Sequence, residues 1–174
     1  EPTALVSLST FGDAGMADRL QTAVQGCAGL PAKVIVTTGP HIDPDSLNAP
    51  AWVEVHRFAP HAELMPGVSV LLGHGGHGTA MAALAHDIPV AVFPLDPKAD
   101  HEMLGRSLER AGAGRLLRRR ASAHDVRDAV AALLADGPHR DAAARLGARV
   151  RSSAGAVGAA DALEAALPSH ANTK

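Results

Sequence analysis

The part of the sequence with the clearest capacity for chemistry is the glycine-rich stretch at 73–79, which reads GHGGHGT. It follows an apolar run typical of a buried strand and precedes a stretch typical of a helix. Glycines leave backbone N–H groups unshielded, and the N-terminus of a helix carries partial positive charge. The stretch therefore predicts a site for a phosphate or diphosphate. The alternative is a tight turn that needs glycine only for its backbone angles, but four glycines in six residues exceed what one turn requires.

The same stretch also matches the dinucleotide fingerprint GxGxxG, so an NAD-binding oxidoreductase domain is a second interpretation. Asp96, at the end of the next predicted strand, stands about where a ribose-binding acid is expected. The fingerprint normally follows the first strand of its unit, whereas three predicted strands precede this one. It also leaves His74 and Thr79 unexplained.

Other residues that could do chemistry have simpler interpretations. A zinc site needs three or four converging ligands, and His74 and His77 straddle glycines in a loop, so we expect no metal site. We expect His77 to face solvent, and the run at 118–120 (RRR) to be a solvated surface. Surface positions are also expected for six further histidines: His41, His56, His61, His124, His139 and His170.

Composition limits the possible functions. The chain has 174 residues, 47% hydrophobic and 20% charged, which is typical of one globular domain spanning 1–174. A net charge of −2 offers no general attraction for nucleic acid, and no apolar run approaches the roughly 18 residues that span a membrane. The single Cys27 is expected to be a buried apolar side chain in a protein of the reducing cytoplasm. A first residue other than Met is consistent with a piece of a longer protein.

Short β-type runs alternate with helical stretches along the chain. This alternation predicts a doubly wound α/β fold, with a mostly parallel, Rossmann-like sheet and helices on both faces. The expected strands lie at 4–9, 33–38, 52–55, 68–72, 89–93 and 115–117. The expected helices lie at 14–28, 79–86 and 100–111, with C-terminal helices from about 122 to 167.

With these elements in place, the sequence resembles the C-terminal, nucleotide-sugar-binding domain of bacterial GT-B glycosyltransferases of the antibiotic type. The family pattern at the loop is HxGGxGT, and residues 74–79 resemble its HGGxGT form. The resemblance extends over most of the chain, to about residue 150. It includes 7–10 (SLST, resembling SLGT), 57–60 (RFAP, resembling GFVP), 83–89 (ALAHDIP, resembling ALAxGVP), 100–101 (DH, at the position of DQ) and 111–114 (AGAG).

The resemblance implies a role for each matching residue. Phe58 and Ala59 would flank the base, and Asp100 and His101 would bind hydroxyls of the donor sugar. The Asp100 position can also be explained as the acidic first turn of a helix. The diphosphate would be bound by His74, Gly75, Gly76, Gly78, Thr79 and Thr10.

The resemblance also implies the reaction, which is transfer of a sugar from a thymidine or uridine diphosphate donor to a hydroxyl of a natural-product acceptor, without a metal or other cofactor. His101 replaces the usual Gln and Leu104 stands where Asn is common, and a deoxysugar with fewer hydroxyls would fit this loss of polar groups. The family's acceptor site and catalytic base belong to an N-terminal domain absent from these residues. We therefore expect this chain alone to be inactive. A non-catalytic nucleotide-sugar-binding module is a third interpretation.

Overall fold

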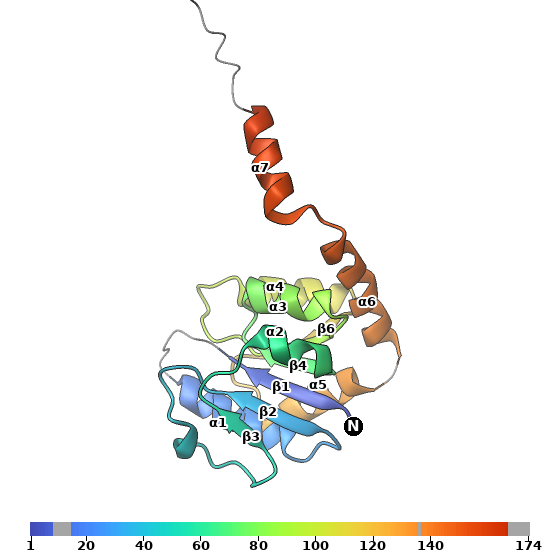
Figure 1. The fold of residues 1–174 in the computed structure, drawn as a ribbon. Helices are drawn as coiled ribbons and strands as arrows, with labels where there is room; N and C mark the ends of the chain where they lie inside the picture. The colour runs from blue at the N-terminus through green and yellow to red at the C-terminus, as the bar shows by residue number, and fades with distance from the viewer. Residues whose placement is uncertain (9–14, 136, 167–174) are drawn as a thin grey trace, which may run out of the picture.

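The centre of the molecule is a parallel β-sheet (Figure 1). The structure is a computed structural model that describes residues 1–8, 15–135 and 137–166. Within these residues the sheet has six strands, all parallel, in the order β3-β2-β1-β4-β5-β6. The strands are β1 (Thr3–Ser7), β2 (Lys33–Thr37), β3 (Glu54–His56), β4 (Val70–Gly73), β5 (Val90–Val92) and β6 (Gly114–Leu116).

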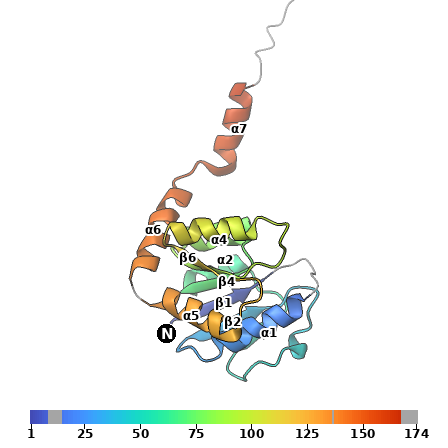
Figure 2. The ribbon, with the colours of Figure 1, turned by 180° about the vertical axis from the view of Figure 1, so that it is seen from behind.

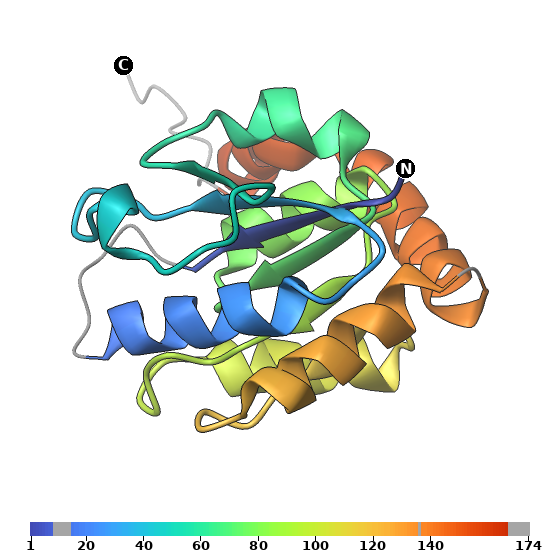
Figure 3. The ribbon, with the colours of Figure 1, turned by 90° about the horizontal axis from the view of Figure 1, so that it is seen from below.

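Helices cover both faces of the sheet, which confirms the doubly wound α/β prediction. One face packs against α1 and α5, and the other packs against α3, α4 and α6 (Figures 2 and 3). The helices are α1 (Met16–Cys27), η1 (Pro44–Ser46), α2 (His61–Leu64), η2 (Met65–Gly67), α3 (His77–Ala85), α4 (His101–Arg110), α5 (Ala123–Leu134), α6 (Pro138–Arg151) and α7 (Gly155–Ala166).

Side chains of the central strands alternate between two apolar layers. On β1, Ala4 and Val6 point into the layer beneath α1 and α5, whereas Leu5 points into the layer beneath α3 and α4. On β4, Leu72 joins the first layer and Leu71 the second. Burial on both faces explains why these strands are continuous apolar runs in the sequence.

Several local predictions are confirmed and others are wrong in detail. Cys27 is fully buried as expected, which raises the pKa of its thiol to about 12. The C-terminal helices begin as expected near residue 122, where Ser122 and Asp125 form a capping box at the start of α5. Helix α3 begins at His77 rather than at 79. The short helices α2 and η2 were not predicted, because one or two turns contain too little periodicity to recognise.

The last helix, α7, extends away from the layered body (Figures 1 and 2). None of its residues is buried, and the side chains of Val157 and Leu163 are 71% and 70% exposed. In the part of the chain that the structure describes, no helix is both long enough and apolar enough to cross a membrane.

Candidate functional site

The candidate site lies where the direction of the sheet's connections reverses. Strands β1 and β4 are neighbours, but the chain continues from β1 toward β2 and from β4 toward β5. The loops that follow the two strands therefore diverge and leave a crevice at their carboxyl ends. A cavity of about 470 Å³ opens at this position, between the end of β1 and the loop after β4.

His74 forms one wall of this cavity. Its half-buried ring donates a hydrogen bond to the backbone carbonyl of Leu8 and meets the ring of His101 edge to face, with centroids 4.8 Å apart and planes at 85°. Burial, and secondarily the facing His101, lower the pKa of His74, whereas the Leu8 hydrogen bond opposes this shift. The net effect disfavours the charged imidazolium form of His74 in the free protein.

The glycine-rich stretch brings the start of helix α3 to the same cavity. Gly76 is the N-cap of α3, and the first backbone hydrogen bond of the helix runs from the N–H of Ala80 to the carbonyl of Gly76. The amides of residues 77–79 precede that bond and have no partner within the helix. Thr79 also lines the cavity. This arrangement can hold an anion, because free N–H groups and the helix dipole both favour negative charge.

Gly75 holds the stretch against the neighbouring helix. Its φ of +96° is in the left-handed region, and a β-carbon there would lie 2.9 Å from Cγ1 of Val92 and 3.0 Å from the carbonyl oxygen of His101. Only glycine satisfies both constraints without strain. The start of α4 therefore sits directly against the loop.

The opposite wall of the cavity is formed by the segment after β3. Phe58 is 76% exposed and lines the cavity together with Ala59. His61, the first residue of α2, lines it as well, and burial lowers its pKa. Its placement corrects the expectation of a surface position, because the unpredicted helix α2 turns its first residue toward the cavity. In the sequence, only the adjoining RFAP motif at 57–60 could have indicated that His61 lines the cavity.

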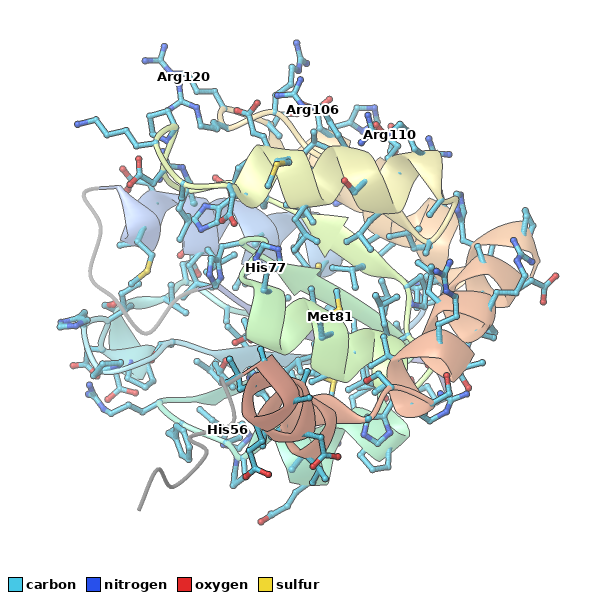
Figure 4. All side chains as sticks on the ribbon, turned by 90° about the horizontal axis from the view of Figure 1, so that it is seen from above. His56, His77, Met81, Arg106, Arg110 and Arg120 are labelled. Atoms are coloured by element: carbon cyan, nitrogen blue, oxygen red, sulfur yellow. The ribbon has the colours of Figure 1, made fainter. Side chains whose placement is uncertain are left out.

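The two residues expected to bind the sugar lie at the start of α4. Asp100 is the N-cap of α4, and its Oδ2 is 3.4 Å from Nδ1 of His77. His77, labelled in Figure 4, is exposed as expected, but it also pairs with this carboxylate. Within the described ranges, Nδ1 of His101 is buried and has no hydrogen-bond partner.

The remaining predicted residues lie apart from the cavity or outside the described residues. Thr10 is outside them. Arg118 and Arg120 (the latter labelled in Figure 4) are exposed, as expected for a solvated surface, whereas Arg119 is half-buried and its Nε lies 3.9 Å from Oε1 of Glu102. His139 was expected at the surface but is half-buried, because its Nδ1 is 2.6 Å from the carbonyl oxygen of Gly112.

Comparison with known proteins identifies the family. A family model described as "Erythromycin biosynthesis protein CIII-like, C-terminal domain" matches residues 21–165. The chain belongs to this family. Among curated proteins that match, 4'-demethylrebeccamycin synthase of Lentzea aerocolonigenes is 36% identical over 146 residues, covering 83% of this chain and 34% of that protein. A PGL/p-HBAD biosynthesis glycosyltransferase of Mycobacterium tuberculosis is 35% identical over 141 residues, which cover 79% of this chain and 32% of that protein.

Solved structures agree with this EryCIII-like assignment. The calicheamicin glycosyltransferase CalG4 is 28% identical with a TM-score of 0.81, over 94% of this chain and 43% of that one. The kitacinnamycin glycotransferase is also 28% identical with a TM-score of 0.81, and the match covers 97% of this chain and 44% of that chain. The fold is thus that of GT-B C-terminal domains, and the chain spans about a third of the curated relatives it matches. Membership of this family does not favour the NAD-binding interpretation.

Proposed function

We propose that this chain is the donor-binding half of a glycosyltransferase that moves a sugar from a nucleoside diphosphate to a hydroxyl of a natural-product acceptor. The observation that carries the proposal is the convergence of His74 and the free amides of α3 on one cavity, opposite Phe58. The names of the relatives support the reaction class. The proposed acceptor domain and catalytic base belong to a part of the enzyme outside these residues.

The proposed donor pose follows from the chemistry of the two walls. The diphosphate is placed at His74, Gly75, Gly76, Gly78 and Thr79, where backbone N–H groups and positive helix potential converge. The base is placed against Phe58 and Ala59, since an exposed aromatic face at a cavity offers a stacking surface. The sugar is placed toward Asp100 and His101. Thr10 completes the proposed phosphate contacts.

This pose accounts for the chemical step that the chain assists. The bond from the anomeric carbon to the distal phosphate oxygen breaks, the acceptor oxygen bonds to that carbon, and a base outside this chain removes the hydroxyl proton. Negative charge develops on the departing diphosphate, where the N-terminus of α3 and His74 stabilise it. These groups need no metal ion for that role.

We propose thymidine or uridine as the nucleoside. Two proteins of the same fold were solved with a nucleoside diphosphate of this kind: VinC in complex with dTDP, and the spinosyn rhamnosyltransferase SpnG with thymidine diphosphate. A deoxysugar fits the replacement of Gln by His101, because the imidazole offers fewer polar contacts than a carboxamide. We place the enzyme in the cytoplasm.

Calorimetric titration of the 174-residue chain tests the proposal. Thymidine or uridine diphosphate should bind saturably, and more tightly than the monophosphate, because the second phosphate lies nearer the start of α3. NAD should bind much more weakly than either diphosphate. Equal binding of diphosphate and monophosphate, or preferred binding of NAD, would contradict the pose.

A second experiment separates the half-enzyme from a non-catalytic binding module. The chain alone should form no glycoside detectable by mass spectrometry, because it holds neither the acceptor nor the base that must approach the hydroxyl proton. Addition of an N-terminal domain from the same protein should restore transfer. Robust transfer by this chain alone would refute the half-enzyme assignment.

A further inference from the structure

The strand order separates the two walls of the cavity. The proposed phosphate wall follows β4 and the proposed base wall follows β3, in a sheet of order β3-β2-β1-β4-β5-β6. Neighbouring strands lie about 4.8 Å apart, so the carboxyl ends of β2 and β1 form a floor between the walls. In a nucleoside diphosphate the pentose links the base to the phosphates. A donor that reaches both walls therefore places its pentose above this floor.

Two hydroxyl groups occupy the floor. Ser7 at the end of β1 and Thr37 at the end of β2 are register partners, and both line the cavity. The side chains point to the face of the sheet that α3 covers, because they follow Leu5 and Ile35 of that apolar layer by two positions. The pair therefore lies beneath the ligand and between the two walls.

The hydrogen bond within this pair leaves one proton unused. The hydroxyl of Thr37 donates to Oγ of Ser7 over 2.8 Å, and neither hydroxyl has another partner within the described residues. Since Oγ of Ser7 accepts this bond, its own O–H points elsewhere. Thr37 is buried and Ser7 is half-buried, so Ser7 presents the remaining donor to the cavity.

His61 supplies an acceptor on the same side of the sheet. It begins α2, and the adjoining Leu64 and Met65 pack in the apolar layer beneath α3. The ring of His61 lines the cavity and has no hydrogen-bond or ion-pair partner in the part of the chain that the structure describes. Burial lowers its pKa and so favours the neutral ring, in which one nitrogen can accept a hydrogen bond.

We propose that Ser7 and His61 hold the 3′-hydroxyl of the donor's pentose, with Thr37 as the positioning residue that orients Ser7. A hydroxyl has one proton to donate and lone pairs to accept. The 3′-hydroxyl accepts from Ser7 and donates to the unprotonated ring nitrogen of His61. A phosphate oxygen would satisfy Ser7 but would face the lone pair of that nitrogen. This inference rests on the proposed function, to which it adds a site for the pentose.

Comparison of two ligands tests the inference on the unmodified chain. Thymidine diphosphate and 2′,3′-dideoxythymidine diphosphate differ only in the 3′-hydroxyl, which thymidine and uridine nucleotides share. Calorimetry at pH 7.5 should show that the full chain binds thymidine diphosphate more tightly, by about fivefold to hundredfold, because two hydrogen bonds are lost with the hydroxyl.

Variants then assign this preference to the residues. Ser7→Ala and His61→Leu should each weaken binding of thymidine diphosphate by about twofold to tenfold and leave the affinity for the dideoxy compound unchanged. Thr37→Val keeps the Ser7 hydroxyl but not its orientation, so it should reduce the preference less than Ser7→Ala does. Ser69→Ala is the matched control, because this half-buried serine bonds the N–H of Thr3 at the opposite end of the sheet. It should bind both ligands as the parent does.

The outcomes separate this inference from the proposed function. Equal affinity of the parent for the two ligands would overturn the inference and leave the proposed function standing. Equal weakening of both ligands by Ser7→Ala or His61→Leu would place these side chains on the phosphates or the base and would also overturn it. Absence of any binding by the folded parent would overturn both. The comparison on the parent does not depend on whether a variant folds.

Discussion

The backbone of Gly76 lies directly against the imidazole of His74. A β-carbon at position 76 would lie 2.6 Å from Nε2 and 2.8 Å from Cε1 of that ring. At Gly78, two residues later, a β-carbon would meet no atom within 4 Å. The glycines of one motif therefore act in different ways: Gly76 makes room for a side chain of the protein itself, whereas Gly78 leaves open space outside it.

Gly76→Ala should displace the His74 ring and so weaken binding of thymidine diphosphate. The φ of −68° at Gly76 suits alanine, so the backbone should tolerate the change. Loss of a hydrogen bond to a charged group costs about 1.5–3 kcal/mol, which corresponds to roughly tenfold to hundredfold in affinity. Calorimetry measures the affinity, and unchanged binding would show that the ring does not contact the diphosphate.

Gly78→Val should weaken the same binding without lowering the melting temperature. The free chain has space for the side chain, but a phosphate at the first turn of α3 would be crowded by it. Gly67→Ala serves as a matched control, because its β-carbon also meets nothing within 4 Å and it lies outside the cavity. Equal affinities of the Gly78 variant and the parent would mean that the loop is only a turn.

His74→Ala should reduce affinity for the diphosphate by about tenfold to hundredfold. His77→Ala should have a far smaller effect, because His77 is exposed and faces Asp100. The two variants should be compared in one titration series at a single pH. Reversed effects would place the motif one register away from the proposed assignment.

Gly75→Ala should destabilise the fold itself. Its positive φ and the close approach to Val92 and His101 leave no unstrained place for a β-carbon. A residue held in the left-handed region costs on the order of 1–3 kcal/mol, which urea unfolding resolves. An unchanged free energy of unfolding would contradict this prediction.

The capping box of α5 should make stability depend on pH. Hydrogen bonds from the backbone and side chain of Ser122 lower the pKa of Asp125 below its ordinary value. The stabilisation is therefore present above the unfolded-state pKa and is lost as the pH falls through the lower folded-state pKa. Ser122→Ala should cost about 1 kcal/mol at pH 7, and the difference from the parent in urea unfolding should shrink in acid.

The sequence predicts the strands and longer helices well, because each has a strong local signal. The apolar run before residue 73 and the helical spacing of Met16, Leu20 and Val24 do not depend on distant contacts. The role of His61 could not be predicted, since the two-turn segment after Pro60 contains no periodicity. The His74–His101 contact could not be predicted either, because these residues are 27 positions apart and meet only through the packing of α4 on the loop.

Apart from Ser7 and Thr10, the proposed donor contacts lie on two separate stretches of the chain, and this has an evolutionary consequence. Under the proposed assignment, residues 57–61 contact the nucleoside, whereas residues 74–101 hold the phosphates and sugar. Only the short segment 62–72, with α2, η2 and the start of β4, separates the two. A single recombination event within that segment would pair the base preference of one ancestor with the sugar preference of another, so new donor combinations can arise by exchange of intact halves as well as by stepwise mutation.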